Sequence, residues 1–505
     1  MAAETVVAGA PGQPMPADRG NGSFCNPVLA GDHPDPAILK DGSDYYLTFS
    51  SLQCCPGLVI WHSRDLVNWA PITAALNHPV GSVRAANLVK HDGRHFIYFT
   101  ASQCGRVAIL VVHADDVRGP WSAPVDLGLD GGGDPAHAVD EDGRRHLLVD
   151  GMQRVALSDD GLTTAGPLLP AHRPGATLRD VGPDALALDG PRLVRRGEFI
   201  YRLSAAGGSG RPAGSHTVTV ARSRSVLGPW EDCPFNPVAR THDADQPWWT
   251  SGCPCLVEGP AGDWWMLCHG LRNGDRTLGR QTLLEPIEWT RDGWFRASGS
   301  RLDRPQRKPR GGIATIARPP LCDDFSRNRL GVQWSFYDAV PGELARAHYD
   351  GTGLVLRGRG TGLRDCSPLT CVASDSSYEA EIDFELDGAA QGGLALFHDA
   401  RGFVGVGIGD GRMHTYSYGQ EHSWMQQAVQ GRRHRLRITN RRHLLTFEHA
   451  TADGHWVRNP WLTEVSALHQ TAVGGFASPR LALFAAGAGH VRLRQFSYQR
   501  IGPDA

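Results

Sequence analysis

Five segments of this chain repeat one pattern, an apolar stretch followed by a glycine turn and a second strand-forming run. The segments read PAILKDGSDYYLTFS, ANLVKHDGRHFIYFT, PAHAVDEDGRRHLLVDG, PRLVRRGEFIYRLSA and PCLVEGPAGDWWMLCHG. Their turn glycines have spacings of 51, 50, 54 and 65 residues and are Gly42, Gly93, Gly143, Gly197 and Gly262. A hairpin signal that returns about every 50 residues is typical of propeller blades. The repeat predicts an all-β chain that opens with a five-bladed β-propeller.

Acidic residues precede several of the repeats. The residues just before the five segments are Asp35, Ala85, Asp134, Asp189-Gly190 and Cys253. Equivalent positions in a propeller lie at equivalent radius, so Asp35, Asp134 and Asp189 are expected to converge at one end of the channel. Three such carboxylates can form an acid–base site. The alternative is that each aspartate before Pro or Gly-Pro only caps a turn.

Length and charge limit the classes of protein that fit. The chain has 505 residues, which is too long for one hydrophobic core and predicts two large domains. The formal net charge is −2 and the basic runs are short, which argues against nucleic acid or an anionic membrane as a partner. The first residues lack the pattern of a signal peptide, and no apolar stretch approaches a membrane span. We therefore expect a soluble cytoplasmic protein.

The eleven cysteines are an odd number. Three lie in apolar runs and are expected to be free, buried thiols: Cys104, Cys255 and Cys268. One local disulfide between Cys366 and Cys371 remains an open alternative. Cys253 and Cys255 would point to opposite faces of a strand, and no second Cys/His pair has zinc spacing. We expect no metal and no cofactor.

The composition divides the chain into regions. Residues 1–23 are rich in proline, glycine and small residues and are expected to form a flexible arm. The propeller is expected over residues 24–310, and the basic, proline-rich residues 301–320 are expected to link it along the surface to a second domain. From residue 322 to 503 the 50-residue period stops, while runs such as YEAEIDFEL and RLALFAAG alternate. Several short strands without helices predict a β-sandwich there.

One segment resembles a known family. NPVLAGDHPDPAI resembles the opening of glycoside hydrolase family 43, the inverting xylosidases and arabinofuranosidases with a five-bladed propeller. Further similar segments follow in order: PGLVIWHSRDLVNW, GDPAHAVDEDG, DGPRLVRRGEFIY and LGRQTLLEPIEW. From DDFSRNRLGVQW onward the chain resembles the sandwich domain of the β-xylosidase branch. The resemblance covers nearly the whole chain past residue 24 and implies a concanavalin-like β-sandwich after the propeller.

The resemblance implies roles for the three aspartates. Asp35 matches the general base that activates water, and Asp134 matches the residue that orients the acid and tunes its pKa. Asp189 stands where the family has a glutamate as general acid. Inversion needs one ionised and one protonated carboxyl about 6.5–9.5 Å apart. Aspartate is shorter than glutamate by one bond of about 1.5 Å, so either the backbone compensates or Asp189 reaches the glycosidic oxygen poorly.

The resemblance also implies substrate-binding positions, several of which depart from the family. Leu52 replaces an aromatic residue, Arg84 replaces a tryptophan that walls the sugar site, and Cys253 replaces a channel histidine that holds an ion in some members. Arg280 matches an arginine on the sugar hydroxyls, and His216 matches a histidine near the site. The alternatives are a surface or ion-paired arginine at Arg84 and a structural histidine at His216.

Together these features predict an inverting exo-glycosidase. It would cleave a terminal xyloside or arabinofuranoside-like sugar from a small oligosaccharide or glycoside. The alternative is a sugar-binding family 43 homologue with weak or lost hydrolysis, or one with altered sugar specificity. The sandwich domain resembles one often found in oligomers, which leaves a homo-oligomer open.

Overall fold

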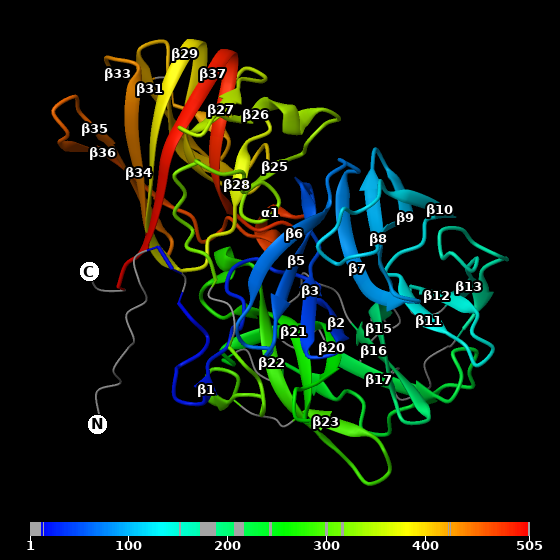
Figure 1. The fold of residues 1–505 in the computed structure, drawn as a ribbon. Coiled ribbons are helices and arrows are strands. Elements are labelled where there is room, and N and C mark those ends of the chain that lie inside the picture. The colour runs from blue at the N-terminus through cyan, green and yellow to red at the C-terminus, as the bar shows by residue number, and fades with distance from the viewer. Residues whose placement is uncertain are drawn as a thin grey trace, which may run out of the picture.

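The structure is a computed structural model of the 505-residue chain. It describes residues 12–502 except 14, 151–152, 172–187, 207–216, 242–244, 298–300, 315–317, 423 and 425. For residues 188, 189, 206, 250, 251 and 471 it describes the backbone alone. The chain forms a propeller, drawn from blue to green in Figure 1, and a sandwich beside it, drawn from yellow to red.

Five sheets of the described chain form the propeller, and each takes its strands in sequence order. The first two blades are β2 (Ala37–Asp41), β3 (Asp44–Thr48), β5 (Gly57–Ser63) and β6 (Ala70–Leu76), then β7 (Ser82–His91), β8 (Arg94–Gln103), β9 (Arg106–Ala114) and β10 (Val125–Asp130). The third blade is β11 (Ala136–Val139), β12 (Arg145–Val149), β13 (Gln153–Ala156) and β14 (Leu169–Pro170). The fourth is β15 (Leu188–Arg196), β16 (Phe199–Ala206), β17 (Thr217–Ser223) and β18 (Glu231–Asp232), with β19 (Ala239–Arg240) also paired to β17. The fifth is β20 (Trp248–Glu258), β21 (Trp264–Arg272), β22 (Arg280–Trp289) and β23 (Phe295–Ala297), with a 3-10 turn at Arg276–Leu278.

The repeated glycines sit where each first hairpin turns. All five have positive φ, between 59° and 82°: Gly42, Gly93, Gly143, Gly197 and Gly262. Glycine adopts this left-handed conformation without the steric cost that a Cβ brings. The predicted five-bladed propeller is therefore confirmed, and its turns have a local cause in the sequence.

The second domain is a β-sandwich, as predicted, but its two central strands are long. Its strands are β25 (Ser335–Tyr337), β26 (Ala347–Tyr349), β27 (Leu354–Arg357), β28 (Leu369–Cys371), β29 (Ser377–Phe397), β30 (Phe403–Gly409), β31 (Arg412–Ser417), β32 (Gln420–Glu421), β33 (Gln427–Ala428), β34 (Arg433–Arg441), β35 (Leu444–Ala450), β36 (Trp456–Glu464) and β37 (Arg480–Arg500). β29 and β37 have 21 residues each and pair from end to end. The expectation of short strands alone is wrong, because this pair runs through both layers around one core that contains Trp334, Phe384 and Phe496. A four-residue helix α1 (Gln470–Val473) and a 3-10 turn at Glu343–Arg346 complete the domain. No described helix is long and apolar enough to cross a membrane.

Main-chain pairing joins the two domains. β4 (Cys54–Cys55), which lies between β3 and β5 of the first blade, pairs with β25 of the sandwich. At the other side of the first blade, Lys308 of the linker lies 2.6 Å from the Asp18 carboxylate and 3.0 Å from that of Asp65. β1 (Ser23–Phe24) pairs with β24 (Gln306–Arg307) beside this contact. The first blade is thus held by the N-terminal segment, the linker and the sandwich together.

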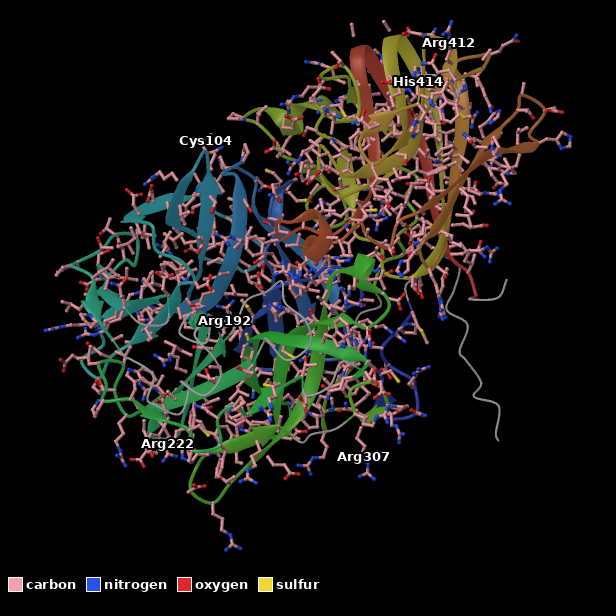
Figure 2. All side chains as sticks on the ribbon, turned by 180° about the vertical axis from the view of Figure 1, so that it is seen from behind. Cys104, Arg192, Arg222, Arg307, Arg412 and His414 are labelled. Atoms are coloured by element: carbon pink, nitrogen blue, oxygen red, sulfur yellow. The ribbon has the colours of Figure 1, made fainter. Side chains whose placement is uncertain are left out.

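All eleven cysteines lie in the described residues and are free thiols. Cys255 and Cys268 are buried, as expected, but Cys104 is exposed in the turn between β8 and β9 (Figure 2). The prediction of a buried Cys104 is wrong because the apolar run ends before it and the chain turns there with φ 51°. Cys366 and Cys371 are both buried and form no bridge.

Candidate active site

One residue in each blade, just before the first strand or within it, has a left-handed backbone. These residues are Asp35 (φ 57°), Ala85 (52°), Asp134 (48°), Gly190 (61°) and Cys253 (46°). The same turn in every blade brings them to equivalent places, as the repeat predicts. In the fourth blade, however, the equivalent residue is Gly190, so the expectation that Asp189 matches Asp35 and Asp134 is wrong by one residue. Asp189 belongs to β15, and its backbone pairs with Ala205 of β16. The Asp189 side chain lies outside the described part of the structure.

The Asp35 carboxylate is buried and surrounded by donors. Ser50 Oγ donates to Oδ2 at 2.5 Å, while the Cys253 thiol donates to Oδ1 at 3.2 Å. Arg280 Nη1 lies 3.3 Å from the same Oδ1. His269 Nδ1 is 3.4 Å from Oδ1 but accepts the Asp35 amide proton at 3.1 Å, so the neutral imidazole cannot also donate to the carboxylate.

These contacts decide the charge of Asp35. Burial raises the pKa of this carboxyl, but the Arg280 guanidinium and the donors Ser50 and Cys253 outweigh burial and bring the pKa well below its ordinary value. Asp35 is therefore ionised across the neutral and mildly acidic range. The ionised form is the one that a general base needs, because only the carboxylate can take a proton.

Asp134 is affected in the opposite direction. Burial and the negative charge of Asp35 raise the pKa of the Asp134 carboxyl, despite the opposing hydrogen bond from the Gly190 amide. That amide donates to Asp134 Oδ2 at 2.5 Å, and Thr100 Oγ1 accepts the Asp134 amide proton at 3.0 Å. The Gly190 amide belongs to the peptide bond between Asp189 and Gly190. Asp134 therefore fixes the position of the Asp189 backbone.

A buried arginine stands between these groups. Arg192, in β15, donates from Nε to the Pro36 carbonyl at 3.4 Å and from Nη1 to the Pro191 carbonyl at 3.1 Å. Figure 2 places it toward the middle of the propeller. Burial lowers the pKa of Arg192, but the neighbouring thiols Cys255 and Cys253 and the carboxyls Asp134 and Asp35 raise it above the ordinary value. In the sequence this guanidinium is indicated only by one basic residue in an apolar run.

The two thiols of the fifth blade do not follow strand alternation. Cys253 donates to the Asp35 carboxylate, and Cys255 donates to the Pro36 carbonyl at 3.0 Å. The prediction that they point to opposite faces is wrong, because the left-handed turn at Cys253 shifts the register between Gly252 and Cys255.

Three side chains offer metal donors. The ligand atoms of Asp35, Cys253 and His269 all lie within 4.8 Å of one another. Sulfur and nitrogen suit zinc better than calcium. The Arg280 guanidinium already places a fixed positive charge beside the same carboxylate, so these residues fit a metal poorly.

A segment of the sandwich closes one side of the site. The Phe476 carbonyl accepts a hydrogen bond from Arg280 Nη2 at 3.0 Å, and the Phe476 ring lies 4.8 Å from the Arg84 guanidinium carbon. Arg84 Nη2 also donates to Ser102 Oγ at 3.4 Å, and its charge opposes the rise in the pKa of Asp134. Leu52 is buried, and its main chain pairs with Val83, next to Arg84.

The structure thus gathers most of the residues expected from the sequence. Asp35, Asp134, Arg280, Cys253 and Arg84 lie around one end of the channel, while His216 lies outside the described residues. Sequence reasoning missed four contributors: Ser50, His269, Arg192 and Phe476. The segment CHG in the fifth repeat could have indicated His269. No pattern in the sequence around Phe476 indicates its contact with Arg280, because the two residues are 196 positions apart.

Comparison with known families decides the classification. Residues 24–295 match the family described as Glycosyl hydrolases family 43, and residues 322–499 match the beta xylosidase C-terminal concanavalin A-like domain. The chain belongs to glycoside hydrolase family 43. This family 43 protein is 32% identical over 331 residues to a non-reducing end alpha-L-arabinofuranosidase of Bacteroides ovatus, a match that covers 62% of this chain and 61% of the relative. It is 31% identical over 314 residues to a xylan 1,3-beta-xylosidase of a Vibrio species, covering 54% of this chain and 57% of that protein.

These matches span less than two thirds of the length of the curated relatives. Among solved structures, a family 43 protein of Bacillus licheniformis superposes with a TM-score of 0.83 at 24% identity. That superposition covers 95% of this chain and 100% of the other, so the two share both domains of the fold.

Proposed function

We propose that this family 43 protein is an inverting exo-glycosidase that removes a terminal xyloside or arabinofuranoside-like unit from a small glycoside. The names of its relatives, an arabinofuranosidase and a xylosidase, favour this substrate class. One observation carries the proposal. Arg280 holds the Asp35 carboxylate ionised, and the neighbouring Asp134 carboxyl accepts a hydrogen bond from the amide that follows Asp189, so a charged base lies beside the peptide that bears the proposed acid.

In the proposed reaction Asp35 takes a proton from water while the water oxygen bonds to the anomeric carbon. The glycosidic bond breaks as Asp189 gives a proton to the leaving oxygen. Asp134 keeps the Asp189–Gly190 peptide in place through its contact with the Gly190 amide. Arg280 keeps Asp35 ionised, and the Phe476 carbonyl holds the Arg280 guanidinium in place.

A panel of aryl glycosides tests the proposal. Wild type should release nitrophenol from β-xylosides or α-arabinofuranosides, and Asp35→Asn should lower kcat by about 100- to 10,000-fold. Asp41→Asn, at the far end of the strand β2 that follows Asp35, is the matched control and should keep its activity. Proton NMR should show the inverted anomer as first product. Binding of pentoses without hydrolysis of any activated glycoside would instead establish the sugar-binding alternative.

Arg84 decides between a neutral and an acidic sugar in this proposal. Its guanidinium rests on the Phe476 ring where an apolar wall would suit a plain pentose. Arg84→Trp should raise kcat/KM on neutral pentosides relative to uronic-acid glycosides. An unchanged ratio would place Arg84 outside the sugar-binding surface.

A further inference from the structure

A cavity lies between the two domains, beside the segment that carries Asp35. Its volume is about 100 Å³, and both domains line it. The propeller side includes Phe49 and Trp61, and the side of the linker and sandwich includes Leu321 and Val372. Since one water occupies about 30 Å³ of liquid, the cavity can hold a small polyatomic ion or molecule.

Two arginines from different segments line this cavity, Arg318 of the linker and Arg480 at the start of β37. Within the described residues, neither guanidinium makes a hydrogen bond or an ion pair; Arg318 lies 5.2 Å from the centre of the Trp61 ring. Burial lowers the pKa of Arg318 to about 10, and Asp375 opposes this only through its charge. Both side chains are partly buried, and two guanidinium groups that share a cavity repel each other unless an anion lies between them.

The other charged groups on the wall do not neutralise this pair. Arg329 is already used, since it donates to the carbonyls of Cys322 and Pro320. Burial and the charges of Arg318 and Arg480 lower the pKa of His33 to about 3, so its ring is neutral near pH 7. Asp32 is the one carboxylate on the wall among the described residues, which leaves a net positive charge.

The same wall carries acceptors without donors. Among the described residues, Asp32 Oδ2, Ser51 Oγ and Gln333 Oε1 are buried and have no hydrogen-bond partner. Buried polar atoms are paired in the great majority of cases. An occupant that satisfies this cavity must accept hydrogen bonds from two guanidinium groups and also donate at least one.

We propose that the interdomain cavity binds a small anion that carries its own hydroxyl group, either hydrogen phosphate or a short hydroxycarboxylate. Its charged oxygens accept from Arg318 and Arg480, and its hydroxyl donates to Asp32 or Gln333. The arginine fork suits both phosphate and carboxylate. Because Ser50 and His33 also line the cavity, the ligand sits against the segments that hold Asp35, and it joins them to β37.

Calorimetric titration of the full-length protein at fixed ionic strength tests this site with inorganic phosphate, sulfate, glycolate and acetate. Phosphate should bind saturably and at least tenfold more tightly than sulfate, which has the same shape but no proton to donate at pH 7. Glycolate should exceed acetate for the same reason, and whichever of phosphate and glycolate binds more tightly identifies the natural class. Arg480→Met should weaken binding at least tenfold, and the control Arg327→Met, which removes an exposed arginine, should not.

Two further measurements separate this site from the channel and from misfolding. Arg84→Met should keep phosphate affinity; a loss there, with none in Arg480→Met, would place the anion in the channel and overturn the proposal. In anion-free buffer Arg480→Met should unfold at the same temperature as wild type or higher, because it removes repulsion. In phosphate only wild type should gain stability. If wild type shows no saturable binding, water alone fills the cavity. If Arg327→Met weakens binding as much as Arg480→Met, the anion is attracted by surface charge in general. Either result would overturn the proposal.

Discussion

Replacing Gly190 with alanine adds one methyl group at the centre of the channel. Gly190 has φ 61°, and a Cβ there would lie 3.0 Å from Cys253 Sγ and 3.9 Å from Asp134 Oδ2. The sulfur contact is about 0.5 Å shorter than an ordinary contact of about 3.5 Å, so either the thiol or the peptide must shift. The thiol donates to Asp35, and the Gly190 amide donates to Asp134, so either shift displaces a carboxylate contact.

The expected loss follows from that displacement. Since a misplacement of about 1 Å can lower a rate about 100-fold, a shift of half that size should lower kcat/KM about tenfold. The left-handed backbone adds a stability cost of about 1–2 kcal/mol. Gly42→Ala is the matched control, because Gly42 has φ 62° and a Cβ there meets no atom within 4 Å. Both variants should lose similar stability in urea unfolding, and only Gly190→Ala should lose activity.

The assay is kcat/KM on an activated aryl pentoside, with circular dichroism to verify folding. Adding Cys253→Ala to Gly190→Ala removes the sulfur, so the double variant should be no less active than Cys253→Ala alone. Equal activity in Gly190→Ala and Gly42→Ala would refute the reasoning, because it would show that the contact with Cys253 has no bearing on the carboxylates.

Four other predictions concern the same site. Ser50→Ala removes a donor from Asp35 and should raise the pKa of that carboxyl, so the acidic limb of the kcat/KM profile should move to higher pH; an unmoved limb would contradict the assigned base. Because the pKa of Asp35 is lower in the folded than in the unfolded protein, its ionisation stabilises the fold above about pH 4, and acid titration of wild type should show this contribution lost as the pH falls below that value. Phe476→Ala should raise KM more than it lowers kcat, whereas Phe235→Ala, which removes a ring of similar exposure under Arg296, should change neither. Asp189→Glu should narrow the rate difference between activated and natural leaving groups if the aspartate reaches poorly; equal rates in wild type with chemistry limiting would count against that idea.

Much of the propeller could be predicted because its signals are local. The turn glycines each mark a hairpin, and their left-handed conformation depends on residues a few positions away. The same repeat placed Asp35 and Asp134 at equivalent positions without knowledge of any contact. It misplaced Asp189 by one residue, because the turn of the fourth blade uses Gly190, and a pattern of letters does not show which residue adopts the positive φ.

The sequence by itself determined the blades, the sandwich and two of the carboxylates, since periodicity and turn chemistry act over short stretches of chain. The tertiary structure alone decided the charge of those carboxylates. Arg280 reaches Asp35 across 245 residues, Gly190 reaches Asp134 across 56, and Phe476 reaches Arg280 from the other domain. A pKa depends on burial and on charges within a few ångströms, and residues distant in sequence supply both of them here only after the blades have closed and the sandwich has docked.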